Sequence, residues 1–65
     1  MRYLVIIQND KSIRTDDLEE AKDFGYFSDA PAQIVDLERK RFQDCTSFIW
    51  YNLTEEEVKS IDDSI

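Results

Sequence analysis

Carboxylates are the most numerous side chains in this sequence that could take part in binding or catalysis. Fifteen Asp and Glu residues stand against eight Lys and Arg residues, which gives a formal net charge of −7, and there is no histidine. Most of the carboxylates gather in two segments. The first holds Asp16, Asp17, Glu19, Glu20 and Asp23, and the second holds Glu55, Glu56, Glu57, Asp62 and Asp63. Because closely spaced carboxylates attract cationic surfaces, we expect all of these residues except Glu57 to form a partner-binding acidic patch.

Helical spacing would bring carboxylates of the first segment onto one exposed face. Residues three, four and seven apart are neighbours on a helix, which groups Asp16, Glu19, Glu20 and Asp23. Like charges at this spacing each cost a few tenths of a kcal/mol in helix stability. A solvated helix face that binds nothing is the alternative interpretation. If both acidic segments are helices that cover the same face of a sheet, their outer surfaces form one continuous negative patch.

Catalysis is disfavoured by the residue types that the chain lacks. Without histidine the usual nucleophilic triads cannot form, and one glycine cannot build a glycine-rich phosphate loop. A pair of carboxylates could act as acid and base only inside a cleft, which 65 residues rarely enclose. The single cysteine, Cys45, is either a nucleophile or redox sensor, or a small apolar residue near a strand end, and the neighbouring Asp44 would raise its pKa. We expect no enzymatic activity, no catalytic residues, no bound metal and no cofactor.

Length and hydropathy predict one folded, cytosolic domain over residues 1–65. A chain of this size buries only about 60% of the surface that its unfolded form exposes, so its stability margin is thin. The longest apolar runs, Tyr3–Ile7 and Phe48–Tyr51, are far shorter than the roughly 18 residues of a membrane-spanning helix. Hydrophobic residues make up 42% of the chain, which argues against disorder despite the charge.

The first half of the chain shows two strand signals followed by a helix signal. Residues 2–8 are rich in β-branched and aromatic side chains on both faces, which predicts a central strand, and residues 12–14 form a short returning strand. Thr15 has the character of a helix N-cap, and the chain's only glycine, Gly25, suits the position after a helix. The spacing therefore predicts a helix over 16–24, with Leu18, Ala21 and Phe24 facing the core.

The second half of the chain predicts two more strands and a second helix. Residues 32–38 form one strand, residues 38–41 a charged tip, and the return from Phe42 leads to a strand over 46–52. Thr54 and Glu57 have the spacing of a capping box, flanked by Leu53 and Val58 as a hydrophobic staple. Val58, Ile61 and Ile65 would pack on the sheet. We therefore expect an α+β fold: a small, mainly antiparallel sheet of three to four strands with two short helices on one face.

Side chains outside the helices provide secondary contacts. Alternation along 46–52 places Phe48 and Trp50 on one face and Ile49 and Tyr51 on the other, so one apolar face could contact a partner or a second copy of the chain. Half-burial against neighbouring strands is the alternative. The secondary contacts that we expect are Asp36, Glu38, Trp50 and Tyr51, while Asp29 could extend the acidic patch. The basic run 39–41 is a solvated tip or pairs with carboxylates.

In size and composition the chain resembles the small acidic nucleic-acid mimics that phages encode. Uracil-DNA glycosylase inhibitors, anti-restriction proteins and anti-CRISPR proteins belong to that class. The resemblance implies a stoichiometric inhibitor in the host cytosol that occupies a basic, nucleic-acid-binding site of a larger protein. The charge itself disfavours direct contact with nucleic acid or an anionic membrane. We expect a monomer or weak homodimer, and the alternative function is a self-associating structural or regulatory module without mimicry.

Overall fold

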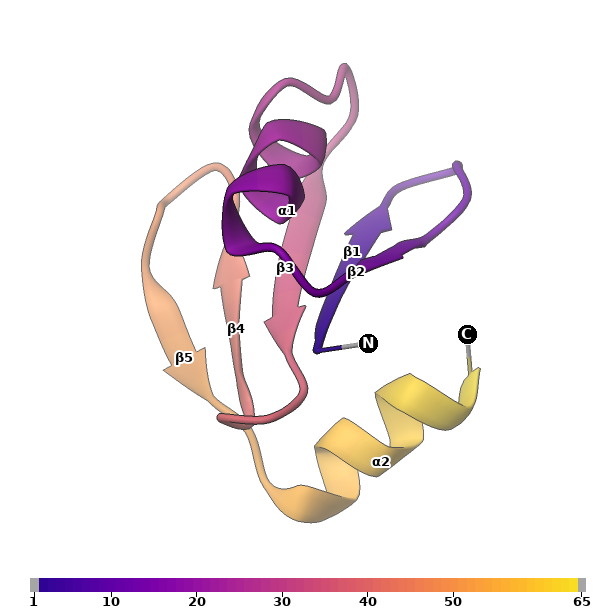
Figure 1. Cartoon of the computed structure of the whole chain (residues 1–65), viewed down its shortest axis with the longest axis vertical. Coiled ribbons are helices and arrows are strands. Elements are labelled where there is room, and N and C mark those ends of the chain that lie inside the picture. The colour runs from indigo at the N-terminus through magenta and orange to yellow at the C-terminus, as the bar shows by residue number, and fades with distance from the viewer. Residues whose placement is uncertain (1, 65) are drawn as a thin grey trace.

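A computed structural model describes residues 2–64 as one antiparallel sheet with two helices (Figure 1). The elements in chain order are β1 (Tyr3–Ile7), β2 (Ile13–Thr15), α1 (Leu18–Tyr26), β3 (Ala32–Asp36), β4 (Arg41–Asp44), β5 (Trp50–Asn52) and α2 (Glu55–Ser64). The predicted α+β class is confirmed. The sheet has five strands, in the order β2-β1-β3-β4-β5, where the sequence predicted three or four.

The apolar strand β1 lies inside the sheet, between β2 and β3. Its register sets Leu4 opposite Val35 and Val5 opposite Ile34. Alternate side chains of a strand point to opposite faces, so Val5 and Ile34 share one face while Leu4 and Val35 share the other. All four side chains are fully buried. The predicted central position of this strand is confirmed, and both faces of the sheet need a cover.

Helix α1 begins later in the chain than the sequence suggested. Asp17, not Thr15, is the N-cap, and its side chain accepts a hydrogen bond of 3.0 Å from the amide of Glu19. Thr15 instead accepts from the amide of Asp17 at 3.1 Å and is buried. Three consecutive residues suit an N-cap here, and the sequence alone could not select among them.

Gly25 lies inside α1, although we expected it to follow the helix. The helix continues to Tyr26, and Phe27 is its C-cap. A Cβ atom built on Gly25 would lie 2.7 Å from Cys45 Sγ and 3.3 Å from Ile34 Cγ1. The glycine is therefore required by the close approach of the helix to the sheet. Phe24, expected in the core, is 40% exposed.

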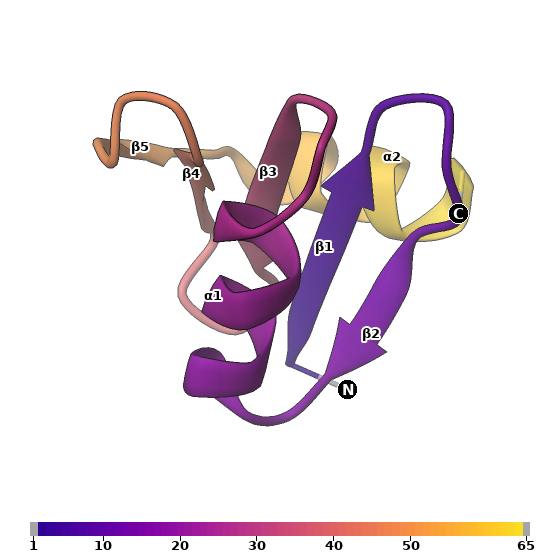
Figure 2. The ribbon, with the colours of Figure 1, turned by 90° about the horizontal axis from the view of Figure 1, so that it is seen from above.

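The two helices lie on opposite faces of the sheet. Ala21 of α1 packs in the same cluster as Val5. Arg14 is the register partner of Leu4, so it lies on the other face, where its guanidinium makes a 2.7 Å ion pair with Asp62 of α2. Figure 2 shows the sheet between the two helices. The prediction that both helices cover one face is wrong, because the second apolar face of β1 also needs a cover.

The capping box at the start of α2 is confirmed. The amide of Glu57 donates to Thr54 Oγ1 and the amide of Thr54 donates to Glu57 Oε1, both at 3.1 Å. Val58 and Ile61 are half-buried, whereas Ile65, which we expected to pack beside them, lies outside the described residues. No helix within residues 2–64 has the length and apolar character needed to cross a membrane.

The predicted strand over 46–52 is wrong in its first half, because the chain reverses there. Asp44 Oδ1 accepts from both the amide and the hydroxyl of Thr46, at 2.9 and 2.7 Å. The amide of Phe48 donates to the carbonyl of Asp44 at 2.9 Å, and Phe48 has a φ of 60°. This turn separates β4 from β5. A phenylalanine with a positive φ is rare, so the sequence did not predict this turn.

Candidate binding surface

The carboxylates of the first acidic segment are exposed along the N-terminal part and outer side of α1. Asp16 accepts a hydrogen bond of 2.9 Å from the amide of Arg2, and Asp17 is the N-cap. Glu19 lies 3.8 Å from the ammonium group of Lys22, on the next turn. Within residues 2–64, Glu20 and Asp23 form no ion pair. These two carboxylates are thus free to meet a cationic partner.

The carboxylates of α2 form shorter ion pairs than those of α1. Lys40 Nζ lies 2.6 Å from Glu55, and this contact holds the pKa of Glu55 below its usual value. Asp62 is paired with Arg14 at 2.7 Å, and Glu57 belongs to the capping box. Glu56 and Asp63 make no ion pair with any described side chain. Three carboxylates of the second acidic segment therefore support the fold, and two are free among the described residues, as in the first segment.

The acidic residues do not form one continuous patch. The condition for continuity was that both helices lie over the same face of the sheet, and they lie over opposite faces (Figure 2). A partner that covers the outer side of α1 meets Glu20 and Asp23, whereas Glu56 and Asp63 project from the other side of the molecule. The two clusters are separate surfaces.

Asp36 was expected as a secondary contact, and the structure contradicts that expectation. Its side chain is 2% exposed and lies 3.1 Å from the Arg2 guanidinium, and it also accepts from the amides of Glu38 and Arg39. Burial alone would raise the pKa of Asp36, but the hydrogen bonds from Arg2 and Arg39 hold it below its usual value. The Asp36 carboxylate is therefore engaged in contacts within the fold and is not available to a partner. Glu38 remains exposed, with one oxygen 3.5 Å from Arg2.

The aromatic contacts expected around β5 fall on two faces. Trp50 is half-buried on the α1 side, where the Arg41 guanidinium lies 4.8 Å from its ring centre. Tyr51 is 45% exposed on the α2 side and stacks on Phe42, with ring centres 5.2 Å apart. The predicted separation of Trp50 from Tyr51 is confirmed. Phe48 belongs to the preceding turn rather than to the strand.

Exposed aromatics at the end of α1 were missed from the sequence. Phe24 is 40% exposed and Phe27 is 82% exposed, and both line an open groove between the end of α1 and the β1–β2 turn. A signal for them was present: Leu18, Ala21 and Gly25 already form the inward stripe, and helical spacing groups Phe27 with Asp23 on the outer side. The groove residues are Ile7, Gln8, Asn9, Asp10, Ile13, Phe24, Phe27, Ser28, Asp29 and Ala30.

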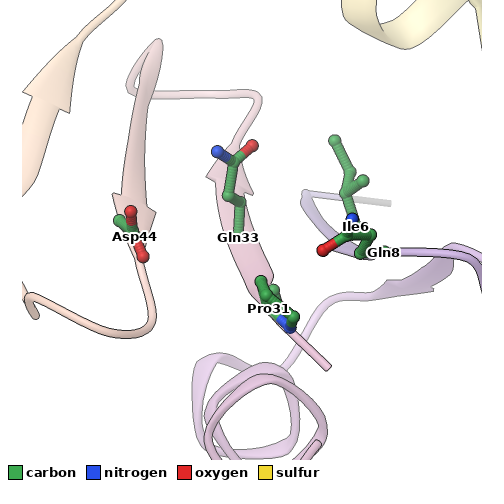
Figure 3. A pocket seen from close by; sticks show the side chains of 6 residues that line it. Ile6, Gln8, Pro31, Gln33 and Asp44 are labelled. Atoms are coloured by element: carbon green, nitrogen blue, oxygen red, sulfur yellow. The ribbon is translucent and has the colours of Figure 1, made fainter. Parts of the chain in front are cut away.

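A second hollow lies over β1 and β3 and is lined by Ile6, Gln8, Pro31, Ala32, Gln33 and Asp44. Figure 3 shows the side chains of Ile6 and Gln33 pointing away from α1. Hydrogen bonds from Thr46 already occupy Asp44 and lower its pKa. The side-chain amides of Gln8 and Gln33 therefore remain free to form hydrogen bonds in this hollow, next to apolar surface.

Cys45 has the properties of a packed residue. Its side chain is half-buried, and burial together with the nearby Asp44 raises the pKa of the thiol, which disfavours the thiolate form. Its sulfur contacts the backbone of α1 at Gly25. Within residues 2–64, no three Cys, Asp or Glu side chains converge in a way that could hold a metal ion.

Comparison of the chain with protein-family models, with curated proteins and with solved structures finds no match.

Proposed function

We propose that this chain is a non-enzymatic, cytosolic binding protein that occupies a basic surface of a larger protein, in the manner of the phage-encoded nucleic-acid mimics. The observation that carries the proposal is the outer side of α1, where Glu20 and Asp23 stand exposed without an ion pair among the described residues. Intramolecular ion pairs meanwhile involve Arg2, Arg14, Lys22 and Lys40. The negative field is thus presented outward instead of being neutralised at this surface.

The same charge selects the kind of partner. A domain of net charge −7 repels nucleic acid and anionic membranes and is drawn toward basic grooves built for phosphates. A nuclease or a CRISPR surveillance complex has such a groove, and the resemblance in size and composition favours this class of target. The contact surface in this proposal is Asp16, Asp17, Glu19, Glu20 and Asp23, with α1 in the centre and α2 turned away.

A charge-reversal experiment tests the proposal. The full chain is used to capture proteins from a bacterial lysate, with elution by a salt gradient and identification of the captured DNA-handling proteins. The variant Glu20→Lys/Asp23→Lys is expected to lose this capture. The matched control Glu56→Lys/Asp63→Lys carries the same change in charge on the opposite side and is expected to retain most of it. Equal losses in both variants would contradict a localised surface, and no salt-sensitive capture would contradict the function.

Self-association is a second candidate function, favoured by exposed apolar side chains around β5. Ile49 and Tyr51 are 54% and 45% exposed next to the edge of the sheet. In this proposal two copies pair through these exposed side chains, and the carboxylates serve solubility. Sedimentation equilibrium at high salt distinguishes the two functions. A dimer that persists and is lost in Tyr51→Ser supports self-association, and a monomer at high concentration argues against it.

A further inference from the structure

The groove between the end of α1 and the β1–β2 turn combines an apolar floor with an acidic rim. Phe24 and Phe27 contribute exposed rings from the helix side, and the half-buried Ile7 and Ile13 contribute from the strands. Phe27 is the most exposed of the large hydrophobic residues in residues 2–64. Figure 1 shows that the loop after β1 and the loop after α1, which border this groove, lie at the same end of the sheet. Because Phe27 is 82% exposed, covering its apolar ring with a partner would be favourable.

Negative charge surrounds this floor. Asp10 and Asp29 line the groove directly. Asp23 precedes Phe27 by one helical turn and Glu20 precedes Phe24 by one turn, so each ring has a carboxylate beside it on the helix surface. The neighbouring cations in the sequence, Lys11, Arg14 and Lys22, line no part of the groove. Arg14 is paired with Asp62 and Lys22 with Glu19. A ligand that fits must therefore bring positive charge to the rim and an apolar group to the floor.

We propose that this groove binds a short cationic peptide segment whose aromatic or aliphatic side chain inserts between Phe24 and Phe27 while its Lys or Arg residues pair with Asp10, Asp23 and Asp29. The inference rests on the proposed function and names the contact through which the basic partner is held. A second copy of the chain is disfavoured as the occupant, because it would bring its own net charge of −7 to the same carboxylates.

Amide chemical shifts of the isotope-labelled full chain test the proposal. The probe is a synthetic peptide of lysine and arginine around one central tryptophan. Two matched peptides accompany it, one with alanine in place of tryptophan and one with glutamine in place of the basic residues. The cationic tryptophan peptide is expected to shift the amides of residues 7–10 and 24–30. Each matched peptide is expected to bind about tenfold more weakly, because each removes one of the two complementary terms.

Two phenylalanine variants locate the contact. Phe27→Ser is expected to weaken binding of the tryptophan peptide about tenfold. Phe48→Ser removes another exposed ring, outside the groove, and is expected to leave binding unchanged. Both positions are exposed, and well-dispersed amide spectra confirm that each variant is folded.

Several outcomes would overturn the groove assignment. Equal affinity for the alanine and tryptophan peptides would show charge attraction alone, and shifts centred on α2 would place the contact elsewhere. Shifts at 24–30 that depend on protein concentration without peptide would identify a second copy as the occupant. The proposed function has a separate readout: lysate capture that depends on Glu20 and Asp23 but not on Phe27 leaves the function standing while the groove fails. Loss of all salt-sensitive capture removes the function itself.

Discussion

Gly25 of α1 packs against Cys45, which follows β4, so closely that a Cβ atom added to the glycine would lie 2.7 Å from the cysteine sulfur. This contact sets how closely the helix lies on the sheet, and therefore where the outer side of α1 presents its carboxylates. A helical glycine normally costs about 1 kcal/mol relative to alanine. The helix contains a glycine despite this cost because a side chain at position 25 would not fit between the helix and the sheet.

Replacing this glycine should destabilise the fold despite the gain in helix propensity. Gly25→Ala adds a methyl group that overlaps Cys45 Sγ and crowds Ile34, and overpacking of this kind costs about 1 to 3 kcal/mol. We expect a net loss of about 1 kcal/mol in urea unfolding after the propensity gain is subtracted. In the Cys45→Ala background the same substitution should cost measurably less. A stabilised single variant would contradict the packing account.

The capping box makes α2 sensitive to a single hydroxyl group. Thr54→Ala removes the acceptor for the Glu57 amide and should cost about 1 kcal/mol. Since α2 has no fully buried residue, we expect the loss to appear mainly as faster hydrogen exchange in α2. Ser60→Ala, an exposed change in the middle of the helix, is the control and should not accelerate exchange in α2. Equal effects of the two substitutions would show that the box contributes nothing.

The buried Asp36 predicts a loss of stability in acid. Its pKa in the folded chain lies below the usual value of 3.8, so its contribution is complete above about pH 4 and is lost as the pH falls through the lowered value. The pKa values of Asp44 and Glu55 are also lowered, and their contributions have the same sign. We expect thermal melts to show a falling midpoint below pH 4.

Removing the Asp36 charge should flatten that acid dependence. Asp36→Asn keeps an acceptor for the turn amides but loses the charged hydrogen bonds from Arg2, at a cost of about 2 kcal/mol at neutral pH. Asp63→Asn, which affects an exposed carboxylate, should change stability by less than about 0.5 kcal/mol. An unchanged pH profile in Asp36→Asn would assign acid lability to other carboxylates.

Charge reversal at the end of α1 should separate stability from binding. Asp23 lies in the last turn, where a negative charge opposes the helix dipole and where α1 has no basic residue. Asp23→Lys should therefore stabilise the fold by about 0.5 kcal/mol while it weakens capture of a basic partner. Asp63→Lys makes the same change near the end of α2 and should stabilise without affecting capture. A variant of Asp23 that gains stability and keeps binding would indicate that this carboxylate has no role in recognition.

Local signals in the sequence predicted most elements, and tertiary contacts decided the rest. The apolar run of β1 predicted a central strand, and the spacing of Thr54 and Glu57 predicted a capping box. Both predictions are confirmed, because each depends on residues close together in the sequence. The side of the sheet that α2 covers depends on Arg14 and Asp62, which are far apart in the chain. The two apolar faces of β1 indicated that both sides of the sheet need a cover, but no local pattern specified this ion pair.

The candidate site was predictable only in part, for the same reason. Exposure of Glu20 and Asp23 follows from helical spacing, whereas the burial of Asp36 depends on its contact with Arg2, which directly precedes the paired strand β1 and is far away in the sequence. The exposed ring of Phe27 was missed because the helix was expected to end at residue 24, which left Phe27 in a connecting loop. The position of Gly25 inside α1, rather than after it, is what turns Phe24 and Phe27 outward.

The shortness of the outermost strands has a consequence for behaviour at high concentration. β2 and β5 border the sheet and span only three residues each, so little unpaired backbone is available to template the addition of further strands. Mutual repulsion between acidic copies adds to this protection. The inhibitor that we propose would have to accumulate without aggregating, and the short edge strands favour such accumulation.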